Sequence, residues 1–467
     1  MWMWMAVAMA QQPVECPFGV NGHQATDAAL ALAADAGVGW VRMDFNWYQF
    51  EPSPGVFDWS AADRFIDSAV AQGLHVYPTI AYAPAWAVAQ GCNDLSPEPA
   101  DWCHNQSPDP TAWAAFVTAA VDRYGDRVKV WGLWNEPNLE HFYRDTRDTY
   151  VRDVLIPGAD AVHTACADCQ TAGPDLANLR EASWDADEGT CLFGECIFNG
   201  WEVSLTEILA EAGDHLDVIT HHRYEGSTEE LYEGLLEGQF LAGVQYMHSV
   251  RSITDAHAPG KPVWITEYGW ETTPGGDHSP AYAAEQLTES FQALPEVQQG
   301  VYSSAPAWPE LAKLFWYDVQ DDPIVHPWGQ YTWGLLDGDG QPKEAYYAYV
   351  DVIADLGGCE AFVPTPATTT TGTTPTCGGT TQPTTCGGTS TEATPSDPAA
   401  TTTTPPTDAG DPTSPQTTST TRPANEDLEA PGAGIATTQT TGCTVVPTPS
   451  GALTIGWLLW PLLRRRS

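Results

Sequence analysis

Between residues 17 and 357, short apolar runs alternate with amphipathic stretches, and this alternation constrains the fold more than any other feature of the chain. Eight runs have the length and composition of buried strands: Phe18–Val20, Gly39–Asp44, Leu74–Ile80, Val128–Leu133, Gln170–Ala172, Leu216–Thr220, Val263–Thr266 and Leu314–Tyr317. The amphipathic stretches predict helices at Asp27–Ala36, Ala61–Gln72, Thr111–Tyr124, Leu231–His257, Ala281–Leu294 and Glu344–Leu356. Strands that alternate with helices predict an α/β fold, and eight such repeats close a (β/α)8 barrel.

The chain has 467 residues, and we assign the barrel to residues 13–360. Within residues 1–12, the first ten are apolar and end in Ala8-Met9-Ala10, which resembles a signal-peptide cleavage site, but the segment lacks the usual positive start. We therefore expect a truncated signal peptide, with a longer leader upstream. Export by another route is the alternative.

Composition changes abruptly after the barrel. Residues 361–444 are dominated by Thr, Pro, Ser and Gly, so they predict a disordered linker with too few apolar residues for a core. Residues 445–467 combine an apolar segment with Arg464-Arg465-Arg466 and resemble a myxobacterial C-terminal sorting tag. A fortuitous apolar terminus is the alternative interpretation.

The net charge is −43, and most of the 61 Asp and Glu residues precede residue 360. A field of one sign this strong disfavours nucleic acid and anionic membrane surfaces as partners, but it does not affect a neutral polysaccharide. The charge also fits an acidic surface kept for solubility, so it carries no catalytic assignment.

Eight cysteines lie in the barrel region, and an even number in local pairs predicts disulfides formed after export. We expect Cys92 to pair with Cys103, and Cys16 with Cys359. Two further pairs, Cys166-x-x-Cys169 and Cys191-x4-Cys196, resemble a zinc ligand set. In a barrel they fall at opposite ends, so we predict no metal site.

Two glutamates follow strands. Val128–Leu133 leads through Trp134-Asn135 into Glu136, and Val263–Thr266 leads directly into Glu267. At the ends of predicted strands four and seven, the two carboxyl groups should face each other across the barrel mouth. Hydrolysis of a glycosidic bond needs such a pair, because one group protonates the leaving oxygen and the other attacks, or activates water, on the opposite face.

Asn135-Glu136-Pro137-Asn138, together with Thr266-Glu267, resembles clan A, the retaining (β/α)8-barrel glycoside hydrolases. Within the clan, Gly334-Leu335-Leu336-Asp337 and Pro342–Tyr347 make the chain most similar to family 39 and to neighbouring family 5-like β-glycanases. The resemblance implies that Glu136 is the general acid/base and Glu267 the nucleophile. It also implies no cofactor and a β-linked oligo- or polysaccharide as substrate.

The resemblance implies supporting residues as well. Asn135 would bind the sugar 2-hydroxyl, and Tyr224, in His222-Arg223-Tyr224, would hold the nucleophile, although adjacent His221 leaves open which histidine points inward. Arg42 would lie beside the nucleophile, with a buried ion pair to Asp44 as the alternative. Trp316 matches the aromatic floor under the sugar.

Further tryptophans are candidates for stacking on sugar rings: Trp47, Trp86, Trp270 and Trp328.

Two other functions compete with hydrolysis. One is a non-catalytic carbohydrate-binding barrel displayed on the cell surface, and the other is an adhesive protein on a Thr/Pro stalk. The retention of both glutamates favours the enzyme. We expect export, with an extracellular or surface-anchored location and membrane attachment through the C-terminal segment.

Overall fold

The computed structural model describes residues 14–89, 100–139, 142–178, 189–192, 195–198, 200–241, 244–273, 276, 278–321 and 332–363. The predicted signal peptide (1–12), nearly all of the linker, the C-terminal segment (445–467), Cys92 and Trp328 lie outside these residues.

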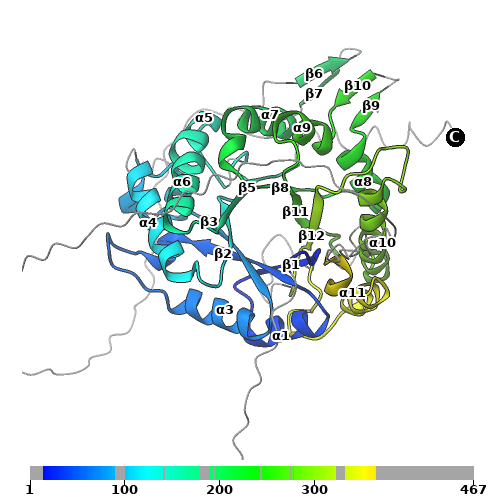
Figure 1. The fold of residues 1–467 in the computed structure, drawn as a ribbon, viewed down its shortest axis with the longest axis horizontal. Helices are drawn as coiled ribbons and strands as arrows, with labels where there is room; N and C mark the ends of the chain where they lie inside the picture. Colours follow the sequence, from blue (N-terminus) through cyan, green and yellow to red (C-terminus); the bar gives the residue numbers. More distant parts are fainter. Residues whose placement is uncertain are drawn as a thin grey trace, which may run out of the picture. The chain divides into compact units, whose positions relative to one another are not determined.

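A closed barrel of eight parallel strands forms the centre of the fold, and each predicted strand is found in it (Figure 1). The strands are β1 (Phe18–His23), β2 (Trp40–Asn46), β3 (His75–Ala81), β4 (Val130–Leu133), β5 (Gln170–Leu176), β8 (Val218–His222), β11 (Val263–Tyr268) and β12 (Leu311–Trp316). Neighbours follow the order β1-β12-β11-β8-β5-β4-β3-β2, so the predicted (β/α)8 barrel is confirmed.

Helices surround the barrel (Figure 1). They are α1 (Asp27–Asp35), α2 (Trp47–Phe50), α3 (Ser60–Ala71), α4 (Pro110–Tyr124), α5 (Arg147–Tyr150), α6 (Ile156–Ala165), α7 (Gly200–Ala212), α8 (Thr228–Leu236), α9 (Val250–His257), α10 (Pro280–Gln299) and α11 (Glu344–Asp355). Several begin with a side-chain cap. Thr26 accepts a hydrogen bond from the N–H of Ala29 at the start of α1, and Asp109 accepts two at the start of α4.

One predicted helix is wrong. The stretch Leu231–His257 is interrupted by an antiparallel hairpin of β9 (Gln239–Leu241) and β10 (Val244–Met247) between α8 and α9. Gly238, with φ of 72°, follows α8 in the left-handed conformation that stops a helix. The predicted long loop Asn178–Val203 likewise holds a hairpin of β6 (Gly189–Leu192) and β7 (Glu195–Phe198).

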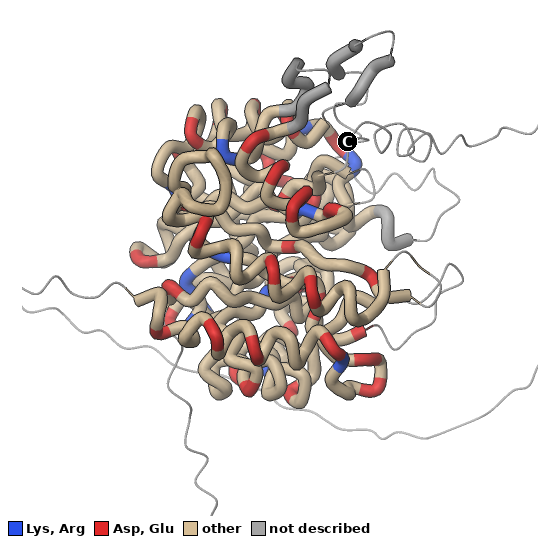
Figure 2. Tube along the Cα trace, turned by 90° about the vertical axis from the view of Figure 1, so that its right-hand side faces the viewer, with Lys and Arg blue, Asp and Glu red and all other residues tan. Residues whose placement is uncertain are grey.

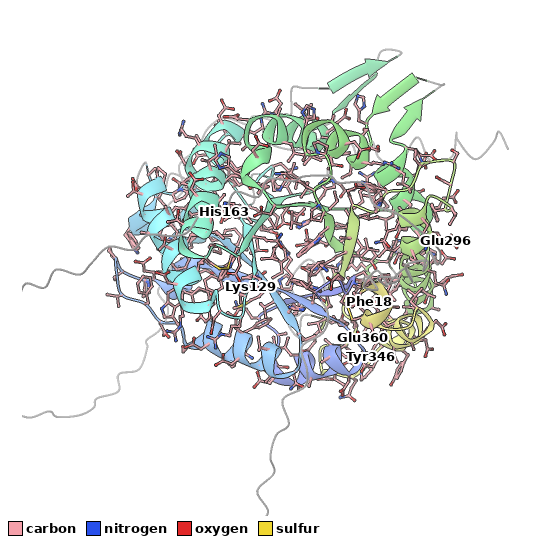
Figure 3. All side chains as sticks on the ribbon, in the orientation of Figure 1. Phe18, Lys129, His163, Glu296, Tyr346 and Glu360 are labelled. Carbon is pink, nitrogen blue, oxygen red and sulfur yellow. A yellow bond between two sulfur atoms is a disulfide. The ribbon has the colours of Figure 1, made fainter. Side chains whose placement is uncertain are left out.

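Aromatic side chains fill the lower part of the barrel interior. The rings of Trp40 and Trp264 meet at 5.0 Å between centroids, and those of Trp264 and Phe315 stack at 5.8 Å. Gly19 leaves room for Phe315, since a Cβ there would lie 2.6 Å from that ring. Outside the barrel, Phe18 packs on Phe291 of α10 at 5.3 Å, within the side-chain layer drawn in Figure 3. The barrel is therefore a packed core that leaves only its upper end for a site.

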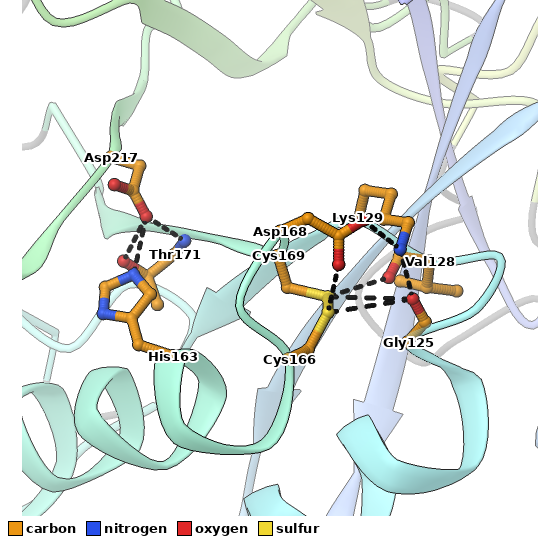
Figure 4. The surroundings of a disulfide bond; sticks show 9 residues. All are labelled: Gly125, Val128, Lys129, His163, Cys166, Asp168, Cys169, Thr171 and Asp217. Carbon is orange, nitrogen blue, oxygen red and sulfur yellow. Dashed lines mark hydrogen bonds and ion pairs between the residues drawn. A yellow bond between two sulfur atoms is a disulfide. The ribbon is translucent and has the colours of Figure 1, made fainter. Parts of the chain in front are cut away.

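Disulfides lie at the lower end of the barrel. Cys16 is bonded to Cys359, as predicted, and joins the start of the first strand to the residues after the last helix. Cys166 is bonded to Cys169, beside an ion pair of 2.8 Å between Lys129 and Asp168 (Figure 4). Because that bond uses both thiols, these cysteines cannot act as thiolate ligands of zinc.

Cys103 is also disulfide-bonded. Its predicted pairing with Cys92 stays a prediction.

Acidic residues are spread over the barrel, whereas Lys and Arg are sparse (Figure 2). Within the described residues, no helix has the length and apolar character that crossing a membrane requires.

Candidate active site

Strained backbone marks the upper end of the barrel. Five described non-glycine residues have positive φ: His23, Tyr82, Trp134, Glu136 and Asp175. All five lie at, or within three residues of, the C-terminal ends of β1, β3, β4 and β5. Such conformations cost about 1–3 kcal/mol each and tend to gather at functional sites.

Glu267, at the end of β11, is held from two sides. Arg42 of β2 donates to one carboxylate oxygen at 2.5 Å, and the Tyr224 hydroxyl donates to the other at 2.8 Å. Arg42 is only 2 % exposed. The carboxylate is therefore fixed in position by one cationic and one neutral donor.

Arg42 contacts several other polar side chains besides Glu267. Its guanidinium also donates to the side-chain oxygens of Asn135 at 2.6 Å and Thr79 at 2.9 Å, and it lies 3.6 Å from Asp175. The alternative of an ion pair with Asp44 is not what the structure shows, because Asp44 contacts His23 instead at 2.9 Å.

Glu136 lies across the mouth from Glu267, at the end of β4. Its Oε1 is 2.8 Å from Nδ1 of His222, and its backbone N–H donates to the carbonyl of Asp175 at 3.0 Å. Burial and the neighbouring Glu267 raise the pKa of Glu136, against the opposing effects of His222 and Arg42. A carboxyl group with a raised pKa is suited to carry a proton.

The pleat of β8 decides which histidine reaches the site. His222 points inward, and burial would lower its pKa, but Glu267, Asp175 and Glu136 raise it to about 9. His221 points outward, where its ring packs against Trp201 of α7 at 4.9 Å. Its pKa is lowered by burial and by the charge of Arg223.

The two glutamates are close together. Glu136, His222 and Glu267 each offer one atom, and these atoms all lie within 4.8 Å of one another. A metal ion could in principle share these ligands. However, Arg42 already occupies Glu267, and a protonated His222 offers no lone pair at Nδ1, so the charges present disfavour a cation there.

Asp175 was missed by the sequence analysis. It lies below the glutamates, fully buried, and accepts hydrogen bonds from Thr266 at 2.5 Å and Tyr77 at 2.9 Å. Burial would raise its pKa, but Arg42, His222 and Thr266 together lower it. The signal was an acid three residues past the predicted end of the fifth strand.

A second missed group borders the site. His23 lies 2.9 Å from Asp44 and 3.9 Å from Asp318. Burial would lower the pKa of His23, but Asp44 and Asp318 raise it to about 9. The pKa of Asp318 is raised to about 7 by burial, despite the opposing charge of His23.

A cavity of about 150 Å³ lies between the glutamates. Both carboxyl groups line it, as do Asn135 and Tyr317. Because Arg42 occupies the amide oxygen of Asn135, the NH₂ group of that side chain remains as its donor.

The predicted aromatic floor needs correction. Trp316 is 0 % exposed and points outward, where its ring packs on Tyr268 at 5.6 Å and on Trp270 at 5.8 Å. Tyr317, the next residue, faces the interior and lines the cavity. Because successive side chains of a strand point to opposite faces, Tyr317 takes the position that was predicted for Trp316.

The other tryptophans that were predicted to stack on sugar rings differ in how exposed they are. Trp270 and Trp47 are buried, so neither ring offers a free face to a sugar. Trp86, in contrast, is 37 % exposed, and its indole N–H donates to the carbonyl of Glu51 at 3.1 Å.

Comparison with known proteins finds similarity to glycoside hydrolases. Residues 20–155 match the model of glycoside hydrolase family 42, described as beta-galactosidase. A family 39 glycoside hydrolase from the gut symbiont Bacteroides cellulosilyticus WH2 has a similar structure, with a TM-score of 0.51 and 20% identity. That match covers 72% of this chain and 64% of the other, so the chain spans less than two thirds of that protein.

A glycoside hydrolase of family 5, subfamily 18, from Streptomyces cattleya, solved in complex with GlcNAc, also has a TM-score of 0.51, with 18% identity. Here the match covers 77% of this chain and 83% of the other. The family match covers residues 20–155, and both solved glycoside hydrolases share the (β/α)8-barrel fold of this chain.

Proposed function

We propose that this protein hydrolyses O-glycosidic bonds of a β-linked oligo- or polysaccharide with retention of anomeric configuration. The observation that carries the proposal is the glutamate pair, in which an oxygen of Glu136 lies within 4.8 Å of an oxygen of Glu267. Retaining enzymes keep their two carboxyl groups about 5–5.5 Å apart, whereas inverting enzymes leave about 6.5–9.5 Å for a water molecule.

In the first step, Glu267 attacks the anomeric carbon and forms a glycosyl ester. Its hydrogen bonds with Arg42 and Tyr224 hold the carboxylate oxygens in place, so little reorganisation is needed at the moment of attack. At the same time, Glu136 gives its proton to the glycosidic oxygen, and the aglycone leaves as an alcohol.

In the second step, Glu136 works as a base. It takes a proton from a water molecule, whose oxygen attacks the anomeric carbon and releases Glu267. The raised pKa of Glu136 fits the first role, and the loss of its proton to the leaving group prepares it for the second.

The names of the similar proteins support a saccharide as the substrate, but they do not agree on one kind of sugar. The matched family is described as beta-galactosidase, one similar structure is a glucosidase from Croceicoccus marinus, and another holds GlcNAc. The proposal therefore names a class of substrate.

We also propose that the protein is exported and held at the cell surface by its C-terminal segment. Disulfides between Cys16 and Cys359 and between Cys166 and Cys169 support an oxidising compartment. Protease treatment of intact cells should remove the protein if it is displayed, whereas recovery only in a cytoplasmic fraction would contradict display.

The test of the reaction is a panel of aryl β-glycosides and β-glycans, followed by NMR of the first-formed sugar anomer. Release of the β-anomer from a β-glycoside supports retention, and release of the α-anomer contradicts it. Binding of glycans without cleavage of any substrate would favour the carbohydrate-binding alternative.

A further inference from the structure

A second and larger cavity adjoins the catalytic one. It has a volume of about 580 Å³, against about 150 Å³ for the cavity between the glutamates. His23 and Tyr317 line both, so the two cavities share a wall. The remaining described lining comes from Gly22 near the end of β1, residues 24–26 after it and residues 318–321 after β12.

The position of this second cavity relative to the two glutamates determines which part of a substrate it can bind. β1 and β12 are neighbours in the barrel, and β12 is four strands away from β4, on the opposite side of the mouth from Glu136. The leaving aglycone must remain beside Glu136, because that group donates its proton. A sugar in the second cavity therefore belongs to the glycone, on the non-reducing side of the cleaved unit.

The charges of the second cavity favour a neutral sugar. Asp318 lines it, and among the described residues one buried carboxylate oxygen of Asp318 has no hydrogen-bond partner. Asp321 is paired with Lys343 at 2.9 Å, and His23 is paired with Asp44. The described lining thus holds no excess of positive charge that would attract a sugar acid.

We propose that this second cavity is a binding site for a neutral sugar unit next to the one that is cleaved. The inference rests on the proposed hydrolysis and deepens it, because an enzyme with such a site acts on glycones of two or more sugars. A glycosidase that removes single terminal sugars would gain nothing from it.

The experiment compares aryl disaccharides with aryl monosaccharides. The probes are para-nitrophenyl β-cellobioside, β-xylobioside and β-mannobioside, each beside the corresponding para-nitrophenyl monosaccharide. For the matching sugar, we expect kcat/KM of the disaccharide to exceed that of the monosaccharide by about tenfold or more, since a bound sugar adds several hydrogen bonds.

Variants of Gln24 locate the effect. Gln24 is exposed and lines the second cavity but not the catalytic one. Gln24→Trp fills space there and should lower the disaccharide-to-monosaccharide ratio about tenfold, whereas Gln24→Ala, which keeps the space open, should leave the ratio near that of the wild type. Gln299→Trp is a matched control, because it places an indole at an exposed position at the end of α10.

Equal kcat/KM for both members of a cleaved pair in the wild type would overturn the inference, as would a ratio that Gln24→Trp does not change. If the wild type cleaves none of the six probes and no member of the wider panel of aryl β-glycosides and β-glycans, the proposed function itself fails, and the inference fails with it.

Discussion

Arg42 at the upper end of the barrel interior and Lys313 at the lower end are both buried, and these two basic side chains have different surroundings. At the upper end, Arg42 contacts the carboxylate of Glu267 at 2.5 Å and the amide oxygen of Asn135 at 2.6 Å. At the lower end, the Lys313 ammonium donates to the backbone carbonyls of Val14 and Cys16 at 2.6 and 2.9 Å. It also lies 4.7 Å from the ring centroid of Trp40.

This difference separates catalysis from stability within one barrel. The partners of Arg42 are side chains that line a cavity and can exchange contacts with a ligand. Those of Lys313 are main-chain oxygens and indole rings in a packed core, beside the disulfide between Cys16 and Cys359. We therefore expect substitutions at the upper end to change rates and those at the lower end to change the free energy of unfolding.

The largest effect is expected from Glu267→Gln. The amide keeps the shape but cannot form the glycosyl ester, so kcat should fall by roughly 10⁴-fold or more on every substrate. Tm should stay within a few degrees of the wild type in thermal unfolding. Substantial remaining activity, with the amide confirmed by mass spectrometry, would contradict the nucleophile role.

Glu136→Ala should have the next largest effect. Loss of the proton donor should lower kcat/KM on unactivated glycosides by about 10²–10⁴-fold, but a dinitrophenyl glycoside should still glycosylate Glu267, because its leaving group needs little protonation. Added azide should then restore turnover as a β-glycosyl azide, detected by NMR. An α-glycosyl azide would show that the two glutamates have exchanged roles.

The pH profile tests the same assignment. Because the pKa of Glu136 is raised, kcat/KM on an unactivated glycoside should fall as pH rises through that pKa and Glu136 loses its proton. This alkaline limb should be absent from Glu136→Ala acting on the dinitrophenyl glycoside. Its persistence there would assign the limb to another group.

Lys313→Ala should lower stability and leave activity unchanged, the opposite of what is expected from substitutions at the upper end. It opens a space between Trp40 and Trp264 and leaves the carbonyls of Val14 and Cys16 without their donor, which should cost about 2–4 kcal/mol of unfolding free energy. The expected result is a Tm lowered by several degrees with kcat unchanged at a temperature where the variant is folded. A lower kcat with an unchanged Tm would contradict the claim that the lower end of the barrel serves stability and the upper end serves catalysis.

The last prediction concerns the pH dependence of stability. Burial lowers the pKa of Lys313 to about 7 from its ordinary value of 10.5, so between these values the unfolded chain binds more protons than the folded one. The unfolding free energy of the wild type, relative to Lys313→Met, should therefore rise from about pH 7 to pH 10.5 and stay level below pH 7. Denaturant unfolding at several pH values would measure it, and a flat difference would contradict the lowered pKa.

The sequence predicted the parts of this protein that depend on local pattern. Apolar runs bounded by amphipathic stretches predicted all eight strands, and the strand-to-acid junctions placed Glu136 and Glu267 at the same end of the barrel. The break in Leu231–His257 was missed, because apolar residues of a hairpin in that stretch also suited one long helix.

The direction of side chains at the strand ends was decided by the tertiary structure. Strand register shifts between Asn21 and His23, between Pro174 and Leu176, and between Ile265 and Tyr268. Each shift changes which residues face inward beyond it, and it depends on pairing with a strand that is distant in the sequence. The chain alone therefore determined a barrel with two opposed glutamates, whereas long-range pairing placed Tyr317 rather than Trp316 at the cavity and brought Asp175 and His23 to the site.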